Sequence, residues 1–329
     1  MNHSPIEDKF GRIHNYLRLS LTDKCNLRCK YCMPTDVQFM PNQKLLTTEE
    51  IAQAVRIFVD MGVNKIRLTG GEPMVRKEFP EIVEFLGSLP VKLAITTNGY
   101  YLDKYLHSLK KAGLTRVNIS LDTLRKDRFY AIVKRDHFDR CRENISLALD
   151  HGFDVKINIV VMKNTNDDEI LDFIRWSIKD QIQVRFIEFM PFYHNQWDLT
   201  KTVGAKEILD IIAQEFEFQP VAGDQHDTAR NYQVKEGKGT FGIISTVTAP
   251  FCDGCNRIRL TADGKLKNCL FAVNELDILT PLRQGEDIKP LIYDYFWKKK
   301  ASLGGLKKFT DPGAKEDYER NRGMVAIGG

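Results

Sequence analysis

The sequence YLRLSL, residues 16–21, alternates between apolar and polar side chains. Because successive side chains of a β-strand point to opposite faces, this stretch predicts a strand with its leucines on one face and with Arg18 and Ser20 on the other. Later stretches repeat the pattern, at residues 65–69, 92–98, 116–122 and 155–160. Their polar faces include Arg67, Thr96, Ser120 and Lys156. These strands therefore each have one apolar face and one polar face.

A sixth apolar stretch, QVRFIEFM at residues 183–190, does not alternate cleanly, so Arg185 and Glu188 are assigned to neither face. Segments with helical periodicity separate the six stretches, and several of them begin at Thr or Asp and end at Gly. Alternating strands and helices predict βα units, which form a parallel sheet with right-handed crossovers. An antiparallel sheet with one wet face fits the strand pattern but not the intervening helices.

The polar faces decide between the possible parallel architectures. An open sheet covered by helices on both faces has strands that are apolar throughout. A closed eight-stranded barrel fills its interior with aliphatic side chains. We therefore expect an α/β fold in which six βα units form an incomplete (β/α)6 TIM-like barrel around a polar cavity. Residues 1–195 are expected to form this partial barrel, and residues 196–329 a C-terminal α+β subdomain that covers its open side.

Composition narrows the class of protein. The chain has 329 residues, 43% of them hydrophobic, and a formal net charge of +4, which together favour a folded globular protein and do not indicate a DNA-binding protein. The first residues lack the apolar core of a signal peptide, and no apolar run is long enough to span a membrane. We expect a cytoplasmic protein without a membrane partner.

Six of the seven cysteines fall into two groups of three. In a protein expected to be cytosolic, clustered cysteines of this kind indicate metal ligands. Cys25, Cys29 and Cys32, the first triad, lie in the loop after the first predicted strand. Three thiolates can hold three corners of a four-iron cluster and leave its fourth iron open, whereas a structural zinc ion takes four protein ligands. Cys141 stands alone in a helical segment and is expected to be buried and inert.

The second triad consists of Cys252, Cys255 and Cys269, and again lacks an obvious fourth ligand, although structural zinc stays possible here. The sequence NRIRL follows Cys255 directly and, as a strand, places the guanidinium groups of Arg257 and Arg259 on one side. With Arg18, Arg67 and Lys156 these side chains form a set of five cations that suits a polyanion such as a nucleoside triphosphate.

The first triad, with Tyr31 before its last cysteine and GGEP at residues 70–73, resembles the radical S-adenosylmethionine (SAM) superfamily. The full set of motifs is similar to the GTP 3′,8-cyclase family of molybdenum cofactor biosynthesis along essentially the whole chain. These motifs are the first triad, TGGEP, TTNG, NISLD, EFMP, CDGCNRIRL and the terminal Ile-Gly-Gly.

The resemblance implies two [4Fe-4S] clusters on the six clustered cysteines, with SAM on the open iron of the first. Reduction would split SAM into a 5′-deoxyadenosyl radical, which takes the 3′ hydrogen of GTP and leads to 3′,8-cyclo-7,8-dihydro-GTP. The residues implied for GTP are Arg18, Arg67, Thr96, Lys156, Arg257 and Arg259. Those implied for SAM are Tyr31, Gly70, Gly71, Glu72, Ser120 and Met190. Arg257 and Arg259 are also implied in catalysis, as is the tail that ends in Gly328 and Gly329.

The implied partners are GTP, an electron donor of unknown identity and a cyclic pyranopterin monophosphate synthase that receives the product. A second copy of the chain, in a homodimer, is a further candidate partner. Two other functions stay open. One is a radical SAM enzyme that modifies a peptide and uses the second triad for an auxiliary cluster. The other is a non-catalytic metal-binding RNA module with a basic face, which would need clustered aromatic side chains for base stacking.

Overall fold

A computed structural model describes residues 4–33, 37–193, 195–235, 237 and 239–328. Six parallel strands pair in sequence order and form the centre of the sheet. They are β1 (Tyr16–Ser20), β2 (Lys65–Thr69), β3 (Lys92–Thr97), β4 (Arg116–Ser120), β5 (Asp154–Val161) and β6 (Gln183–Glu188). Their apolar faces are buried in one hydrophobic core, as the alternation predicted.

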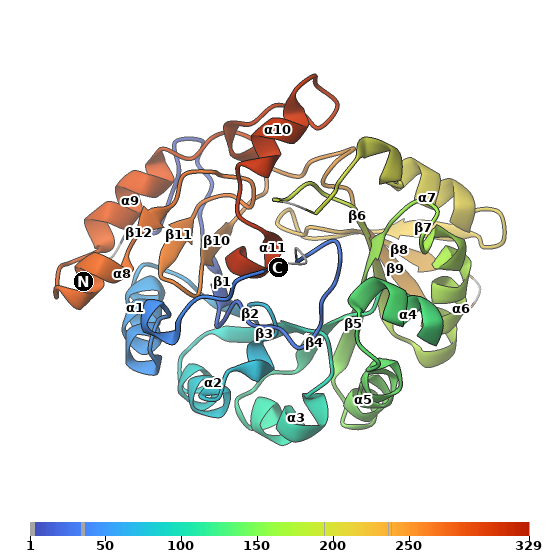
Figure 1. Cartoon of the computed structure of the whole chain (residues 1–329), viewed down its shortest axis with the longest axis horizontal. Helices are drawn as coiled ribbons and strands as arrows, with labels where there is room; N and C mark the ends of the chain where they lie inside the picture. The colour runs from blue at the N-terminus through green and yellow to red at the C-terminus, as the bar shows by residue number, and fades with distance from the viewer. Residues whose placement is uncertain (1–3, 34–36, 194, 236, 238, 329) are drawn as a thin grey trace.

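Helices follow the strands and cover the outside of the sheet, where they pack on its apolar face (Figure 1). They are α1 (Thr48–Asp60), α2 (Phe79–Gly87), α3 (Leu102–Lys111), α4 (Lys126–Val133), α5 (Phe138–Asp150) and α6 (Ile170–Asp180). Thr47 caps α1 because its side chain accepts a hydrogen bond from the Glu50 amide, while the Glu50 carboxylate accepts one from the Thr47 amide. The helical connections therefore all lie on the apolar face of the sheet, and the polar side chains of the strands point away from them.

The C-terminal part of the chain extends the same sheet at both ends. Its strands are β7 (Phe218–Val221), β8 (Arg230–Val234), β9 (Thr240–Ile244), β10 (Arg257–Leu260), β11 (Lys265–Lys267) and β12 (Leu276–Asp277). β9 pairs parallel to β6, and β10 pairs parallel to β1, so the predicted partial barrel continues as an open sheet with β12 and β7 at its edges. The segment expected to cover the open side thus also satisfies the backbone groups of β1 and β6.

The remaining helices surround the C-terminal strands. They are α7 (Ala205–Ile212), α8 (Leu279–Arg283), α9 (Lys289–Trp297), α10 (Ala314–Glu319) and α11 (Met324–Ile327), with short 3-10 turns at 42–44, 73–75, 167–169, 199–201 and 303–305. Figure 1 shows α11 and the chain end inside the arc of strands rather than on the outer surface. No helix in the described part of the chain is long and apolar enough to cross a membrane.

Candidate active site

A cavity of about 1090 Å³ lies inside the arc of strands, and side chains from all six central strands line it. Most residues singled out in the sequence face this cavity. They are Arg18, Tyr31, Arg67, Gly70, Gly71, Thr96, Ser120, Lys156, Met190, Arg257, Arg259 and all six clustered cysteines. Glu72 and Gly328 are not among its lining residues, and Gly329 lies outside the described residues. Residues distant in sequence therefore meet around one space.

Three arginines form a row across neighbouring strands at the wall of this cavity. The strand register aligns Arg18 of β1 with Arg259 of β10 on one side and with Arg67 of β2 on the other. Burial and the adjacent guanidinium groups of Arg67 and Arg257 lower the pKa of Arg18 to about 10, and burial holds the pKa of Arg259 well below its usual value. So many like charges at close range favour a bound polyanion.

The row continues with other ionisable groups. Arg67 donates hydrogen bonds from Nε to the Tyr16 hydroxyl at 2.6 Å and from Nη1 to the Ile95 carbonyl at 2.9 Å. Burial alone would raise the pKa of Tyr16, but Arg67 and Arg18 lower it to about 8. Burial, and after it the charge of Arg185, lowers the pKa of Lys156 to about 8. Both groups therefore titrate close to physiological pH.

The loop that carries the first triad packs directly on the turn formed by Gly70 and Gly71. The Gly71 amide donates to the Thr22 carbonyl at 2.7 Å. A Cβ atom on Gly71 would lie 2.3 Å from the Lys24 carbonyl oxygen, and one on Gly70 would lie 2.6 Å from that of Thr22. Both positions thus require glycine because another part of the chain approaches so closely.

The thiols of the first triad are near enough to raise one another's pKa. Burial is the larger cause, and the pKa of Cys25 rises to about 11 and that of Cys32 to about 12. Among the described residues, no three Cys, His, Asp or Glu side chains converge on a point where a single metal ion could bind. Thiolates of an iron–sulfur cluster bind different irons and need not converge, so this donor set fits a cluster better than zinc.

The second triad faces the same cavity from its other side. Lys299, which is 3% exposed, donates from Nζ to Cys255 Sγ at 3.4 Å. Burial would raise the pKa of the Cys255 thiol, but the charges of Arg257 and Lys299 lower it to about 6. This donor set also fits a cluster with three protein ligands, and the cations Arg257 and Lys299 lie beside it.

Comparisons with known proteins agree with this geometry. Residues 19–177 match the model of the radical SAM superfamily, and residues 182–304 match that of the Molybdenum Cofactor Synthesis C family. The chain is 44% identical to "GTP 3′,8-cyclase, mitochondrial" of Arabidopsis thaliana over 330 residues, which cover 98% of this chain and 83% of the relative. The chain belongs to the GTP 3′,8-cyclase family.

Some relatives are much longer proteins, of which the chain spans about half. "Molybdenum cofactor biosynthesis protein 1" of Drosophila melanogaster is 47% identical over 285 residues, and the match covers 85% of this chain but only half, 50%, of that protein. Among solved structures, Streptococcus suis SuiB bound to precursor peptide SuiA superposes with a TM-score of 0.63 at 16% identity, covering 96% of this chain and 71% of SuiB. This last likeness shows the fold alone.

Glu72 has a different environment from the one expected for this GTP 3′,8-cyclase family member. Its side chain is 0% exposed and accepts hydrogen bonds from the Thr97 hydroxyl at 2.8 Å and the Asn98 amide at 2.7 Å. Burial raises its pKa to about 7. The carboxylate therefore ties the GGEP turn to the TTNG turn behind the cavity wall, and its assignment to SAM stays a prediction.

Sequence analysis gave no role to Asp122, which also lines the cavity. Its Oδ2 accepts a hydrogen bond from the Tyr31 hydroxyl at 2.7 Å, and its Oδ1 accepts one from the Val160 amide at 2.9 Å. Burial raises the pKa of Asp122 to about 6. The signal was present, because Asp122 ends the NISLD motif on the polar face of its strand.

The two residues of the sixth strand that the sequence left unassigned differ in environment. Arg185 lines the cavity. Glu188 is 0% exposed, and its carboxylate accepts hydrogen bonds from the Ala205 amide at 2.8 Å and the Val247 amide at 2.6 Å. Glu188 thus fixes the start of α7 and a turn after β9, which identifies it as a structural residue.

Proposed function

We propose that this chain catalyses the radical cyclisation of GTP to 3′,8-cyclo-7,8-dihydro-GTP, the reaction for which its relatives are named. The row formed by Arg259, Arg18 and Arg67 carries the proposal. Adjacent guanidinium groups repel one another, and a triphosphate would neutralise them by charge-assisted hydrogen bonds. A cluster with bound SAM at the first triad would supply the 5′-deoxyadenosyl radical.

The site residues divide into two groups around the cavity in this proposal. The first triad, with Tyr31, Gly70, Gly71, Glu72, Ser120 and Met190, would hold the first cluster and SAM. Arg18, Arg67, Thr96, Lys156, Arg257 and Arg259, with the second triad, would hold GTP. The cations would fix the triphosphate and so orient the ribose toward the radical source. This positioning would raise the rate of cyclisation. Residues 1–195 would make the radical, and residues 196–329 would supply much of the GTP site.

This division predicts that Arg257→Ala and Arg259→Ala weaken GTP binding without removing SAM cleavage. Each substitution removes a charge-assisted contact, so we expect the Kd for GTP to rise about tenfold to a hundredfold. Anaerobic equilibrium binding measures the Kd, and 5′-deoxyadenosine formed without GTP measures SAM cleavage. Arg175→Ala is the matched control, because Arg175 pairs with Asp172 and Glu215 on the surface. Loss of SAM cleavage in both cavity variants would contradict the division.

The pKa of Lys156, about 8, predicts that GTP binding weakens as the pH rises. A bound polyanion favours the ammonium form, so above this pKa binding must take up a proton and the Kd increases. Tyr16, whose pKa is also about 8, becomes an anion in the same range and acts in the same direction. We expect the Kd to rise about tenfold between about pH 7.5 and about pH 9.

Lys156→Arg separates the two contributions, because arginine keeps its charge throughout this pH range. The variant should retain only the part of the dependence that Tyr16 causes, and Tyr16→Phe in addition should flatten the profile. A pH dependence that is unchanged in Lys156→Arg would show that another group titrates.

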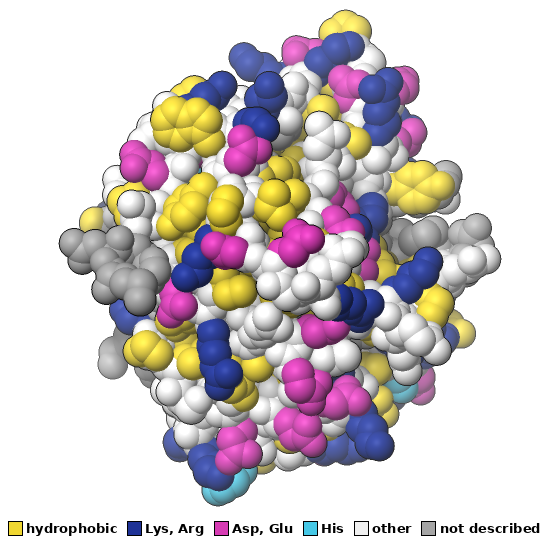
Figure 2. Space-filling model, turned by 90° about the vertical axis from the view of Figure 1, so that its left-hand side faces the viewer, with side chains coloured by type: hydrophobic (Ala, Val, Ile, Leu, Met, Phe, Trp, Pro, Cys, Tyr) yellow, Lys and Arg dark blue, Asp and Glu magenta, His cyan; other side chains and the backbone are white. Residues whose placement is uncertain are grey.

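The two other functions find less support. A peptide substrate would need acidic side chains to match the arginine row, whereas GTP brings a triphosphate. For an RNA module, Figure 2 shows the face that bears α8 and α9, and on it acidic and basic side chains are interspersed rather than gathered in a basic surface. Titration of the reconstituted protein with GTP and with single-stranded RNA discriminates between these possibilities, and preferential RNA binding would overturn the proposed function.

The proposed reaction also needs partners. An electron donor must reduce the first cluster, and the product would pass to a cyclic pyranopterin monophosphate synthase. A homodimer and a cytoplasmic location stay predictions, and the Arabidopsis relative is named as mitochondrial. Gel filtration and cell fractionation would test them.

A further inference from the structure

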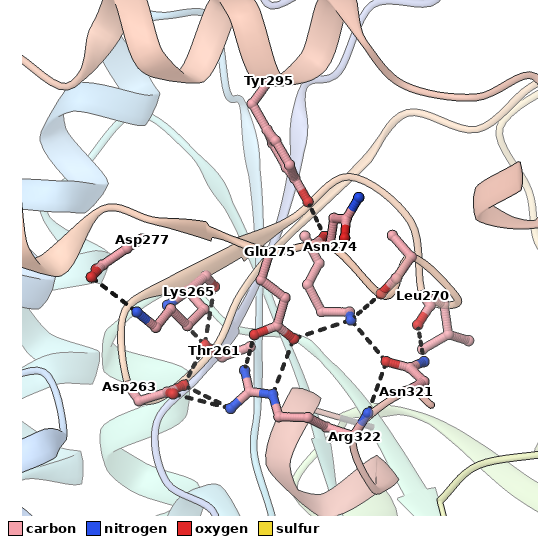
Figure 3. Close-up of polar contacts among 12 residues, drawn as sticks. Thr261, Asp263, Lys265, Leu270, Asn274, Glu275, Asp277, Tyr295, Asn321 and Arg322 are labelled. Atoms are coloured by element: carbon pink, nitrogen blue, oxygen red, sulfur yellow. Dashed lines mark hydrogen bonds and ion pairs between the residues drawn. The ribbon is translucent and has the colours of Figure 1, made fainter. Parts of the chain in front are cut away.

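The tail of the chain is attached at two places. At its end, the Gly328 carbonyl accepts a hydrogen bond from Nη1 of Arg259 at 2.7 Å. Before it, Asn321 and Arg322 lie against the meander of β10, β11 and β12 (Figure 3). The residues between these attachments include buried Val325 and Ile327. The tail therefore enters the cavity region from a fixed starting point.

Arg322 is held by two carboxylates of the meander. Its Nη1 lies 3.0 Å from Oδ2 of Asp263, and its Nε donates to Oε1 of Glu275 at 3.0 Å. Figure 3 shows the guanidinium pointing between these two side chains. The three side chains are 28%, 18% and 16% exposed, so water screens their attraction less than at an open surface.

Asn321 connects the tail to the loop after Cys269. Its Nδ2 donates to the Leu270 carbonyl at 2.9 Å, and its Oδ1 accepts a hydrogen bond from Nζ of Lys267 at 2.9 Å. Lys267 is 0% exposed and also pairs with Glu275 at 3.1 Å and donates to the Ala272 carbonyl. A buried lysine with three partners of this kind is a rigid anchor.

We propose that Asn321 and Arg322 are positioning residues for GTP cyclisation, and we call the set of Asp263, Lys267, Glu275, Asn321 and Arg322 the tail anchor. The anchor sets the register in which residues 323–328 approach the cavity. Both attachments belong to one hairpin, because Arg259 lies in β10 and Asp263 lies in the turn between β10 and β11. If the contacts of the tail anchor were weakened, Gly328 would shift relative to Arg259. This inference rests on the proposed function.

Arg322→Ala in the full-length, cluster-loaded protein tests the anchor. We expect amide hydrogen exchange of residues 323–328 to accelerate at least about tenfold, since the remaining attachment no longer fixes the segment. The kcat of GTP cyclisation should fall about tenfold or more, because small displacements of positioned groups are costly. Iron content, the KM for GTP and SAM cleavage without GTP should stay within about twofold.

Two comparisons separate positioning from general destabilisation. Lys315→Ala removes an exposed ion pair with Glu319 in nearby α10, at 3.9 Å, and should change neither exchange nor cyclisation. Arg322→Lys keeps the positive charge, so its kcat should lie between those of Arg322→Ala and the wild-type protein. Should Arg322→Ala fail to fold, Asp263→Asn weakens the same contact without removing the guanidinium, and it should give the same changes at smaller size.

Unchanged exchange of residues 323–328 in both anchor variants would overturn the inference, as would faster exchange with undiminished cyclisation. Failure of the proposed function has a different signature. In that case the wild-type protein would make no cyclised nucleotide, while the exchange measurement would still report whether the anchor holds the tail.

Discussion

Replacing Cys29 with alanine is expected to abolish SAM cleavage and to remove about half of the bound iron. The first triad offers only three thiols, and two remaining thiolates would not retain a four-iron cluster. Outside the two triads, the described residues hold no group of three His, Cys, Asp or Glu side chains that could bind a metal ion. We therefore expect reconstituted wild-type protein to bind about eight irons per chain and Cys29→Ala about four, with 5′-deoxyadenosine falling to background.

Cys141→Ala is the matched control, because it removes the one cysteine outside the triads. Cys141 is 0% exposed and lies in α5 within the hydrophobic core, so its loss can lower stability but should leave iron content and SAM cleavage unchanged. Iron and sulfide analysis and chromatography of the SAM products measure both outcomes. Near-normal 5′-deoxyadenosine formation by Cys29→Ala, or zinc in place of iron, would contradict the assignment.

The sequence predicted the central strands well because each strand has two chemically different faces. Leu17 and Leu19 had to be buried under helices, so Arg18 had to face the opposite side, where the structure places the cavity. The same reasoning failed for the sixth strand, because Glu188 is polar yet buried among backbone amides. Alternation of apolar and polar residues along a strand cannot reveal a buried carboxylate that accepts hydrogen bonds from backbone amides.

Contacts between distant parts of the chain could not be predicted. The alternation placed Arg18 and Arg259 on polar faces, but only strand pairing makes them neighbours, and their strands are about 240 residues apart in sequence. The glycines of GGEP show the same limit. The resemblance implies that Gly70 and Gly71 bind SAM, but only the structure shows that the carbonyls of Thr22 and Lys24 lie against them.

Gly328→Ala should strongly reduce GTP cyclisation while leaving both clusters and SAM cleavage intact. Gly328 has a φ of +76°, and a Cβ atom there would lie 2.6 Å from Thr69 Oγ1 and 3.0 Å from Ser20 Cβ. Alanine would therefore add about 1–2 kcal/mol of backbone strain to a direct clash, and the tail would withdraw from Arg259. We expect the rate of cyclised nucleotide formation to fall about a hundredfold, and 5′-deoxyadenosine formation without GTP to change less than about twofold.

Gly285→Ala separates the clash from the backbone strain. Gly285 also has a positive φ, +74°, but no atom lies within 4 Å of the position that its Cβ would take. Gly285→Ala therefore has the same conformational cost at a site between α8 and α9. This substitution should lower the free energy of unfolding slightly and leave cyclisation unchanged. Removal of residues 328 and 329 should reproduce the loss seen in Gly328→Ala. Should Gly328→Ala cyclise GTP at the rate of Gly285→Ala, the tail would be a frayed end whose close fit against Ser20 and Thr69 has no part in the reaction.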